Sequence, residues 1–223
     1  MKRIFLSKEM RSIRIGVTSL ALALMTLAAQ GQEKAEHKNA NVRLADKALS
    51  AGNFKEAEKH LLKALPEESK DPDVQYLLGY SQFHNGNFKS AISTFETVLT
   101  IEPRHTSALY YKGMAATKLA VEPNSKLSAT IKEKYLKTAI EDYSKAIAID
   151  ANDPKLYQNR AIAYRDLGIL KGTKEMDNYN KDQATDAYNK AVIDYEKVLS
   201  YDASRKDIQT EVKKAQVYRD NLK

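Results

Sequence analysis

The sequence predicts an all-α fold in which antiparallel helix hairpins stack in a row as a solenoid. Three observations support this fold class. The strings GNFKEA and GNFKSA, at residues 52–57 and 86–91, stand 34 residues apart. The apolar residues on both sides of each string follow the spacing of an amphipathic helix. A single hairpin cannot bury its own apolar faces, so the repeated hairpins must pack against one another.

The first 28 residues are predicted to be a secretory signal peptide. Five basic residues precede or flank the start of an apolar run from Ile15 to Ala29, and the small residues Thr26 and Ala28 favour cleavage before Ala29. A cut after Gly31 is an alternative. The run is shorter than the roughly 20 residues of a spanning helix, so an uncleaved membrane anchor is the less favoured reading. We expect an exported protein, periplasmic or extracellular, with no stable membrane insertion after cleavage.

Two predicted repeats follow a polar segment, residues 29–39, that is expected to be a disordered linker. The first repeat spans 40–70, and the second, 71–104, has the least disturbed pattern. In the second repeat Gly86 suits the positive φ that closes a helix, and Pro103 ends the hairpin. The apolar residues of its two helices are Val74, Leu77, Leu78, Tyr80 and Phe83, then Ala91, Ile92, Phe95, Val98 and Leu99.

The third and fourth repeats carry insertions between their two helices. Ala139 takes the role of Ala91 but follows it by 48 residues, and Ala191 follows Ala139 by 52. The first insertion is predicted to be a turn and an N-terminal helix extension that projects beyond the array, and the second a mobile loop or a frayed helix extension. Both should lie at the same edge. The repeats span 105–151 and 152–203, and the insertions span about 121–134 and 170–187.

The last segment, 204–223, is predicted to be a capping helix. A stack with an open end needs a final helix with an apolar inner face and a charged outer face. The apolar residues expected to face inward are Ile208, Val212, Ala215, Val217 and Leu222.

Composition and charge exclude several classes of function. The chain has 223 residues and no cysteine, which excludes disulfides, thiolate zinc sites and cysteine catalysis. Removal of the leader lowers the formal net charge from +7 to +3, and the remaining lysines alternate with acidic residues, so we expect no nucleic-acid partner. There is no glycine-rich phosphate loop and no pair of histidines at metal-ligand spacing. We expect no catalytic residue, no cofactor and no metal.

The period of 34 residues resembles the tetratricopeptide repeat family. The resemblance rests on a small residue in each first helix, such as Gly79, on the Gly-x-Phe turn, and on Ala91 followed four residues later by the aromatic Phe95. It covers nearly all of the chain after residue 39. It implies a right-handed superhelix of four repeats plus the capping helix, and a non-catalytic role in binding proteins or peptides.

In that family the first helices of the hairpins line a concave surface, and the repeat register transfers those positions to this sequence. The surface is rich in aromatic residues, which combine apolar area with a polar tip and suit a peptide or a partner helix. The alternative is that these residues only pack against a neighbouring part of the curled array or against the terminal segment. The candidate binding residues are Tyr76, Tyr80, Phe83 and His84, then Tyr110, Tyr111 and Met114, then Asn159 and Arg165.

One finer resemblance fails. Asn159 resembles an asparagine of cochaperone repeats that clamps the terminal carboxylate of a chaperone peptide. Tyr110 and Met114 stand where that clamp has Lys and Asn, and Asp207 and Glu211 stand where it has basic residues. Because acidic residues repel a carboxylate, we reject this ligand.

The sequence therefore predicts a protein- or peptide-binding module of the cell envelope whose concave groove holds the partner. A first alternative is a structural scaffold subunit that binds through its convex face and its two inserted extensions. A second alternative is an enzyme or a carbohydrate-binding protein that uses tyrosines as stacking platforms. The identity of the partner and the oligomeric state are left open.

Overall fold

The computed structural model describes residues 37–123 and 125–222, and these residues form nine helices and no strand. The predicted leader and most of the predicted linker lie outside the described residues. The helices are α2 (Ala40–Ser50), α3 (Phe54–Glu68), α4 (Pro72–His84), α5 (Phe88–Ile101), α6 (Thr106–Val121), α7 (Ala129–Ile149), α8 (Pro154–Gly172), α9 (Lys181–Tyr201) and α10 (Lys206–Asp220).

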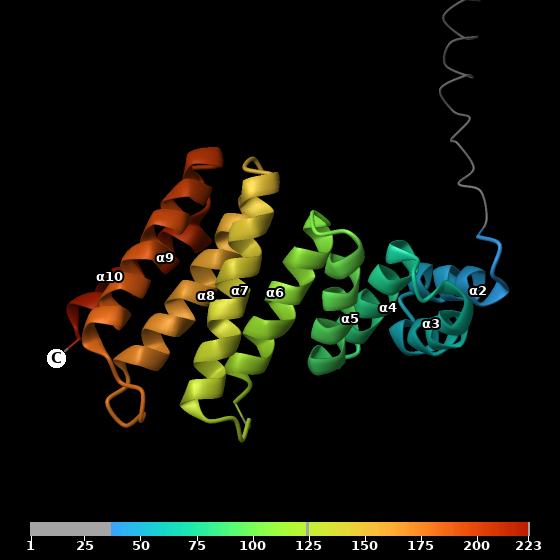
Figure 1. Cartoon of the computed structure of the whole chain (residues 1–223). Helices are drawn as coiled ribbons and strands as arrows, with labels where there is room; N and C mark the ends of the chain where they lie inside the picture. The colour runs from blue at the N-terminus through green and yellow to red at the C-terminus, as the bar shows by residue number, and fades with distance from the viewer. Residues whose placement is uncertain (1–36, 124, 223) are drawn as a thin grey trace, which may run out of the picture. The chain divides into compact units, whose positions relative to one another are not determined.

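Consecutive helices pair as hairpins that lie side by side in chain order (Figure 1). The pairs α2–α3, α4–α5, α6–α7 and α8–α9 form the four hairpins, and α10 packs on α9 at the end of the row. This arrangement confirms the predicted helical solenoid. Its core is a series of small clusters between neighbouring helices, because each hairpin buries its apolar faces only against the next one.

Two glycines form the tight turns that connect the paired helices of the first two hairpins. Gly52 and Gly86 have φ values of 71° and 79°, in the left-handed region that favours glycine. The following residue of the first turn, Asn53, accepts a hydrogen bond from the Glu56 amide at 3.3 Å and so begins α3. The repeated Gly-Asn-Phe strings are therefore the turns between paired helices.

Other glycines allow helices to approach closely. A Cβ added to Gly79 would lie 2.8 Å from the Phe95 ring, and one added to Gly113 would lie 2.8 Å from the Tyr143 ring. Both rings are buried in the core. The small residue of each first helix thus makes room for the large aromatic residue of its partner helix, as the repeat pattern predicts.

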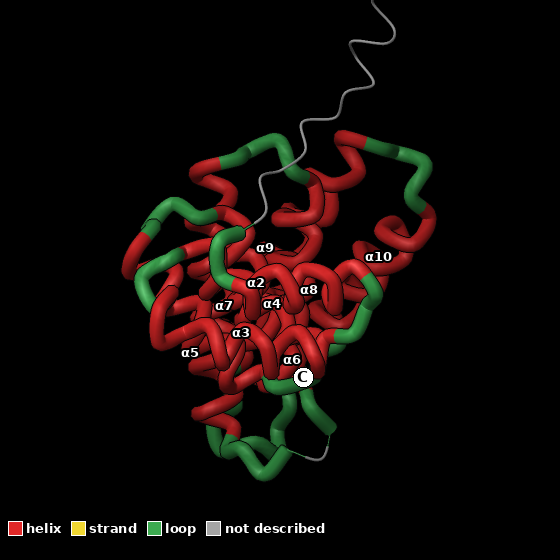
Figure 2. Tube along the Cα trace, turned by 90° about the vertical axis from the view of Figure 1, so that its right-hand side faces the viewer, coloured by secondary structure: helices red, strands yellow, loops and turns green. Residues whose placement is uncertain are grey.

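The insertions lengthen the third and fourth hairpins at their tips. Whereas α5 begins three residues before Ala91, α7 and α9 begin ten residues before Ala139 and Ala191. The added turns repeat the packing of the hairpin body, since a Cβ at Gly168 would lie 2.7 Å from the Tyr188 ring. The two long connections lie at the lower edge of Figure 1, and Figure 2 shows loops gathered at the same lower edge. The second insertion combines a longer α8, a loop and a longer α9.

A polar contact joins the two lengthened tips. Lys171 of α8 is buried, and its Nζ lies 2.7 Å from Glu133 Oε2 of α7. The Asn178 side chain also donates to Glu133, at 3.0 Å, and Lys171 donates to the Asn178 carbonyl at 3.1 Å. Burial raises the pKa of Glu133, but bonds from Lys137, Lys171 and Asn178 outweigh it and lower that pKa to about 2. The tips are therefore tied to each other.

Ion pairs between a buried carboxylate and a half-buried cation join the two helices of the third and fourth hairpins. Arg160 of α8 forms two hydrogen bonds to Asp194 of α9, at 2.7 and 2.8 Å, and a third to Ser144 of α7 at 3.0 Å. In the third hairpin Lys112 Nζ lies 3.3 Å from Asp142 Oδ1, and the other oxygen of that buried carboxylate has no hydrogen-bond partner. The ion pair of the fourth hairpin is better satisfied than that of the third, because both oxygens of its carboxylate accept a hydrogen bond.

The last helix, α10, follows the predicted cap with one correction. Ile208 and Ala215 are buried, and Leu222 packs with the cluster around Tyr188. The prediction that Val217 faces inward is wrong, because its side chain is 53% exposed. It lies two residues after Ala215, which places it on the opposite side of a helix with 3.6 residues per turn.

Candidate functional site

The first helices of the hairpins line one side of the array. α4 contacts α6, α6 contacts α8 and α8 contacts α10, while no second helices of neighbouring hairpins within the described residues make contacts of similar extent. Elements on the inner side of a curved stack lie closer together than those on its outer side. We call the surface that α4, α6, α8 and α10 share the inner surface.

The N-terminal part of the inner surface is a cluster of aromatic rings. The Tyr80 and Tyr111 rings meet edge to face with centroids 5.1 Å apart, and Tyr76 lies 6.2 Å from Tyr80. His84 stacks on Phe54 at 4.4 Å. The sequence pattern thus brings together side chains of α3, α4 and α6. We call these residues, with Phe83 and His105, the aromatic cluster.

The rings of the aromatic cluster pack against one another, which limits what they offer a ligand. Phe83 is 9% exposed and belongs to the core around Phe95, so it contributes packing. Burial also raises the pKa of the Tyr111 hydroxyl, and partial burial lowers the pKa of His84. Among the predicted binding residues of this cluster, His84 is exposed and Tyr76, Tyr80 and Tyr111 are half-buried. A partner would therefore meet ring edges and hydroxyl groups.

Tyr110 connects the aromatic cluster to α8. Its ring lies 5.2 Å from that of Tyr111, and its hydroxyl accepts a hydrogen bond from the Asn159 side chain at 3.3 Å. The same Asn159 nitrogen donates to the Lys155 carbonyl at 2.8 Å. Met114 is half-buried between the clusters around Phe95 and Tyr143. Asn159 is thus engaged within the fold.

The C-terminal part of the inner surface is a polar pocket between α8 and α10. Its volume is about 400 Å³. Tyr195 and Ile208 lie buried at its base, whereas Asp207, Thr210 and Lys214 are exposed at its mouth. We call it the α8–α10 pocket, and its lining residues are Gln158, Ile162, Arg165, Tyr195, Asp207, Ile208, Thr210, Glu211 and Lys214.

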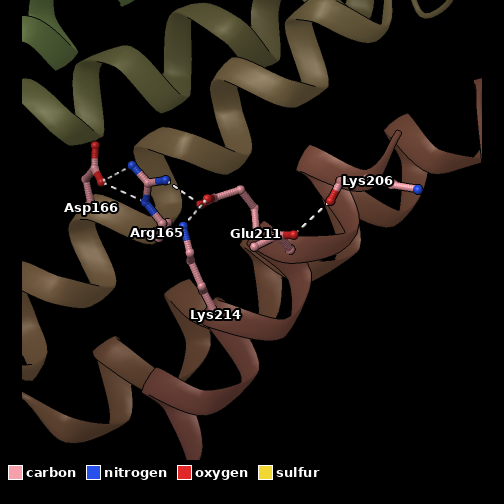
Figure 3. A network of polar contacts seen from close by, with 6 residues as sticks. Arg165, Asp166, Lys206, Glu211 and Lys214 are labelled. Atoms are coloured by element: carbon pink, nitrogen blue, oxygen red, sulfur yellow. Dashed lines mark hydrogen bonds and ion pairs between the residues drawn. The ribbon is translucent and has the colours of Figure 1, made fainter. Parts of the chain in front are cut away.

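A network of charges surrounds Arg165 in this pocket (Figure 3). Its Nε and Nη2 donate to Asp166 at 3.0 and 2.8 Å, and its Nη1 donates to Glu211 at 2.7 Å. Lys214 donates to the other Glu211 oxygen at 2.8 Å. Burial raises the pKa of Glu211, but the bonds from Lys214 and Arg165 outweigh it and lower that pKa overall. Burial raises the pKa of Asp166, although Arg165 opposes that shift. Both carboxylates accept hydrogen bonds from the guanidinium and hold it in place.

The nine predicted binding residues therefore divide into groups. Tyr76, Tyr80, Phe83, His84 and Tyr111 come together, and Tyr110, Met114 and Asn159 form the link to α8. Arg165 stands apart from them, in the α8–α10 pocket. Asp207 and Glu211, the two acidic residues that the sequence analysis took to disfavour a carboxylate ligand, also line this pocket.

Sequence reasoning missed several members of the inner surface. His105 was not among the predicted binding residues, yet it stacks on Tyr76 at 4.9 Å and caps α6 by accepting from the Ala108 amide at 3.2 Å. Thr210 and Lys214 were treated only as part of a capping helix. Thr210 follows Asp207 by three residues, and Lys214 follows Glu211 by three and Thr210 by four. This spacing is the signal that places them on one face of α10.

Comparisons with known proteins agree with this fold. Residues 19–79 match the family model of the tetratricopeptide repeat, and residues 50–121 match the model described as anaphase-promoting complex, cyclosome, subunit 3. The DnaJ homolog subfamily C member 7 homolog of Dictyostelium discoideum is 25% identical over 186 residues, which cover 74% of this chain and 34% of that protein. The human DnaJ homolog subfamily C member 7 is 28% identical over 191 residues, which cover 74% and 38%. The chain thus spans little more than a third of the length of these relatives.

Solved structures of MamA are similar in fold. One, titled crystal structure of MamA protein, is 18% identical with a TM-score of 0.51, and the match covers 81% of this chain and 90% of that one. MamA 41-end from Desulfovibrio magneticus RS-1 is also 18% identical with a TM-score of 0.51, and the coverage is 82% and 97%. None of the helices in the described ranges is long and apolar enough to cross a membrane. Residues 38–123 and 125–222 have the fold of a helical tetratricopeptide repeat solenoid.

Proposed function

We propose that this chain is a non-catalytic protein-interaction module that holds a peptide or a partner helix against its inner surface. One observation carries the proposal. The first helices bring an aromatic cluster and a polar pocket to the same side of the array, with Tyr110 and Asn159 between them. Apolar ring edges beside convergent polar groups are suited to peptide recognition. The matches to repeat families support the same class of function.

Binding would rely on a surface that is already formed. The rings of Tyr76, Tyr80 and Tyr111 brace one another, and Arg165 is fixed by two carboxylates, so few side chains need to be ordered when a partner binds. A lower ordering cost leaves more of the contact free energy for affinity. Specificity would come from the order of apolar and polar subsites along α4, α6 and α8.

We place this activity in the cell envelope on the basis of the predicted leader. Mass spectrometry of the protein isolated from its own cells tests that part of the proposal. The expected N-terminus is Ala29, with residues 1–28 removed. An intact N-terminus in a soluble intracellular fraction would contradict an exported protein.

Affinity capture from an envelope extract tests the role of the inner surface. The bait is the full chain, compared with a Tyr80→Ala/Tyr110→Ala variant and with Ile193→Ser on the outer side of α9, where Ile193 is 63% exposed. Wild type and Ile193→Ser should retain the same partner, and the double variant should lose it. Circular dichroism must show equal helicity for all three proteins. Equal capture by the double variant would refute binding through the inner surface.

A scaffold role is a second candidate, favoured by apolar side chains on the hairpin tips. Val121, Ile131, Ile169 and Met176 are each 39–44% exposed, and the tips that carry them are tied by Lys171 and Glu133. Scattered apolar residues are normal on a surface, but a group on two fixed tips suits a protein contact. Loss of capture by Ile131→Ser/Ile169→Ser, with retention by the Tyr80/Tyr110 variant, would favour the scaffold role.

A further inference from the structure

We infer that the α8–α10 pocket is a subsite for an uncharged carboxamide, such as the side chain of glutamine or asparagine in a bound segment. This inference rests on the proposed function, because it names the chemistry that one part of the inner surface recognises. It is carried by a buried hydroxyl at the base of the pocket, by the hydrogen-bonding groups around it and by the local balance of charge.

The hydroxyl of Tyr195 lies at the base of the pocket. Tyr195 is fully buried and lines the pocket beside Arg165. Its hydroxyl lies close enough to the Arg165 guanidinium to feel its charge, but no group makes a well-aligned hydrogen bond to that oxygen. Most buried polar side-chain atoms have a partner, because an unsatisfied one loses its hydration without compensation. Burial raises the pKa of this hydroxyl, so it stays protonated and offers a donor. A ligand that accepts at the base of the pocket would satisfy it.

The mouth of the pocket supplies a complementary donor and acceptor. The Gln158 carbonyl oxygen accepts from Arg205 Nη2 at 3.3 Å, which leaves the amide nitrogen of Gln158 to donate to a ligand. Thr210 donates its hydroxyl hydrogen to the Lys206 carbonyl at 2.8 Å, which leaves its oxygen to accept. A carboxamide carries both an acceptor and a donor, and the apolar Ile162 and Ile208 suit its aliphatic stem.

The charges of the pocket exclude ionic ligands. Arg165 is already matched by Asp166 and Glu211, and Lys214 also pairs with Glu211. Asp207 is paired with Arg205 at 2.6 Å. A carboxylate ligand would meet the two carboxylates that line the pocket, Asp207 and Glu211, and a cationic ligand would have to break an existing pair. An uncharged polar group is the chemistry that leaves this network intact.

Three small probes with similar stems test the inference by NMR titration of the isotopically labelled full chain. Propionamide is expected to shift the side-chain signals of Gln158 and the signals of Thr210 along a saturating curve. Propionate and propylammonium should bind at least tenfold more weakly. Equal or tighter binding of either ion would overturn the inference, as would the absence of any saturable shift with propionamide.

The variant Tyr195→Phe tests the role of the buried hydroxyl with little change in shape. It should weaken propionamide binding about fivefold, as expected for one lost hydrogen bond. Its stability should change little, because the hydroxyl that it removes makes no well-aligned hydrogen bond in the free protein. Ile193→Ser, on the opposite side of α9, should bind propionamide as wild type does. Unchanged binding by a folded Tyr195→Phe protein would contradict the inference.

These measurements stand apart from the capture experiment. Propionamide binding needs no partner protein, so it can succeed even if capture through the inner surface fails. Conversely, partner capture that depends on Tyr80 and Tyr110, together with failed propionamide binding, would remove the carboxamide subsite and leave the proposed function in place.

Discussion

The second and fourth hairpins fill the same repeat positions with different chemistry. Directly before the small residue of the first helix, the second hairpin has Leu78 and the fourth has Arg160. Directly before the large aromatic residue of the second helix, the second has Thr94 and the fourth has Asp194. The third hairpin resembles the fourth, because it has Lys112 and Asp142 at these two positions. One backbone pattern therefore accepts either an apolar and hydrogen-bonded contact or an ion pair with a buried carboxylate.

The same division separates the two parts of the inner surface. The second hairpin contributes most of the aromatic cluster, and the fourth contributes Gln158 and Arg165 to the polar pocket. The repeat positions that stack the hairpins are kept in both. The positions around them vary, and this variation is what gives each part of the surface its own chemistry.

The largest effect is expected from breaking the ion pair of the fourth hairpin. Asp194→Ala removes the carboxylate that accepts two hydrogen bonds from the half-buried Arg160 guanidinium, so we expect a loss of about 3 kcal/mol in the free energy of unfolding. Thr94→Ala in the second hairpin removes one neutral hydrogen bond to Gln82 and should cost about 0.5–1.5 kcal/mol. Urea unfolding followed by circular dichroism measures both.

A double substitution separates the ion pair from simple packing. Arg160→Leu with Asp194→Thr gives the fourth hairpin the residues of the second. It should recover most of the stability lost in Asp194→Ala, because no charge is left unpaired. If the double variant is as unstable as Asp194→Ala, the two hairpins are not interchangeable at these positions.

A smaller loss is expected at the close helix contact of the third hairpin. In Gly113→Ala the new Cβ would lie 2.8 Å from the ring of Tyr143, which is 1% exposed and has little room to move. Overpacking of this kind costs about 1–3 kcal/mol in the free energy of unfolding. Lys145→Ala on an exposed face of the same hairpin should change it by no more than about 0.5 kcal/mol. Equal stability of the two variants would contradict the close-contact role of Gly113.

An effect of similar size is expected in the pH dependence of stability, and it comes from the third hairpin. Burial raises the pKa of Asp142 to about 6, although Lys112 and Lys145 oppose the shift. Because the folded state holds this proton more tightly than the unfolded chain, its contribution to stability is present below about pH 4 and is lost as pH rises through 6. The loss should be on the order of 1–3 kcal/mol.

Asp142→Asn tests this origin of the pH dependence. The variant cannot titrate at this position, so urea midpoints measured between pH 4 and 7 should lack that part of the decline. A variant that declines as steeply as wild type would show that another group is responsible.

The stacked hairpins could be predicted from the sequence because each repeated residue has a local structural role. Gly86 marks a turn, Gly79 marks a close contact and Phe95 marks the space that this contact leaves. The lengthened tips were also predictable, since the delayed Ala139 and Ala191 require extra residues within their hairpins. Val217 was misplaced because its apolar character was weighed without its angular position on α10.

The pocket was not predictable in the same way. It depends on how far α10 stands from α8, and no repeat pattern fixes that distance at the end of a stack. Residues of three helices, α8, α9 and α10, must meet to form it, and Tyr195 has a core role in the repeat. The division of the predicted binding residues between a packed aromatic cluster and a separate pocket therefore emerged only from the three-dimensional arrangement.

Hydrogen exchange of the full chain with and without its captured partner tests binding through the inner surface most directly. The account predicts that the partner slows exchange of backbone amides in α4, α6, α8 and α10, while amides of α5, α7 and α9 and of the two hairpin tips exchange as in the free protein. Protection confined to the tips at residues 121–131 and 169–181, with α4 and α6 unchanged, would contradict the account.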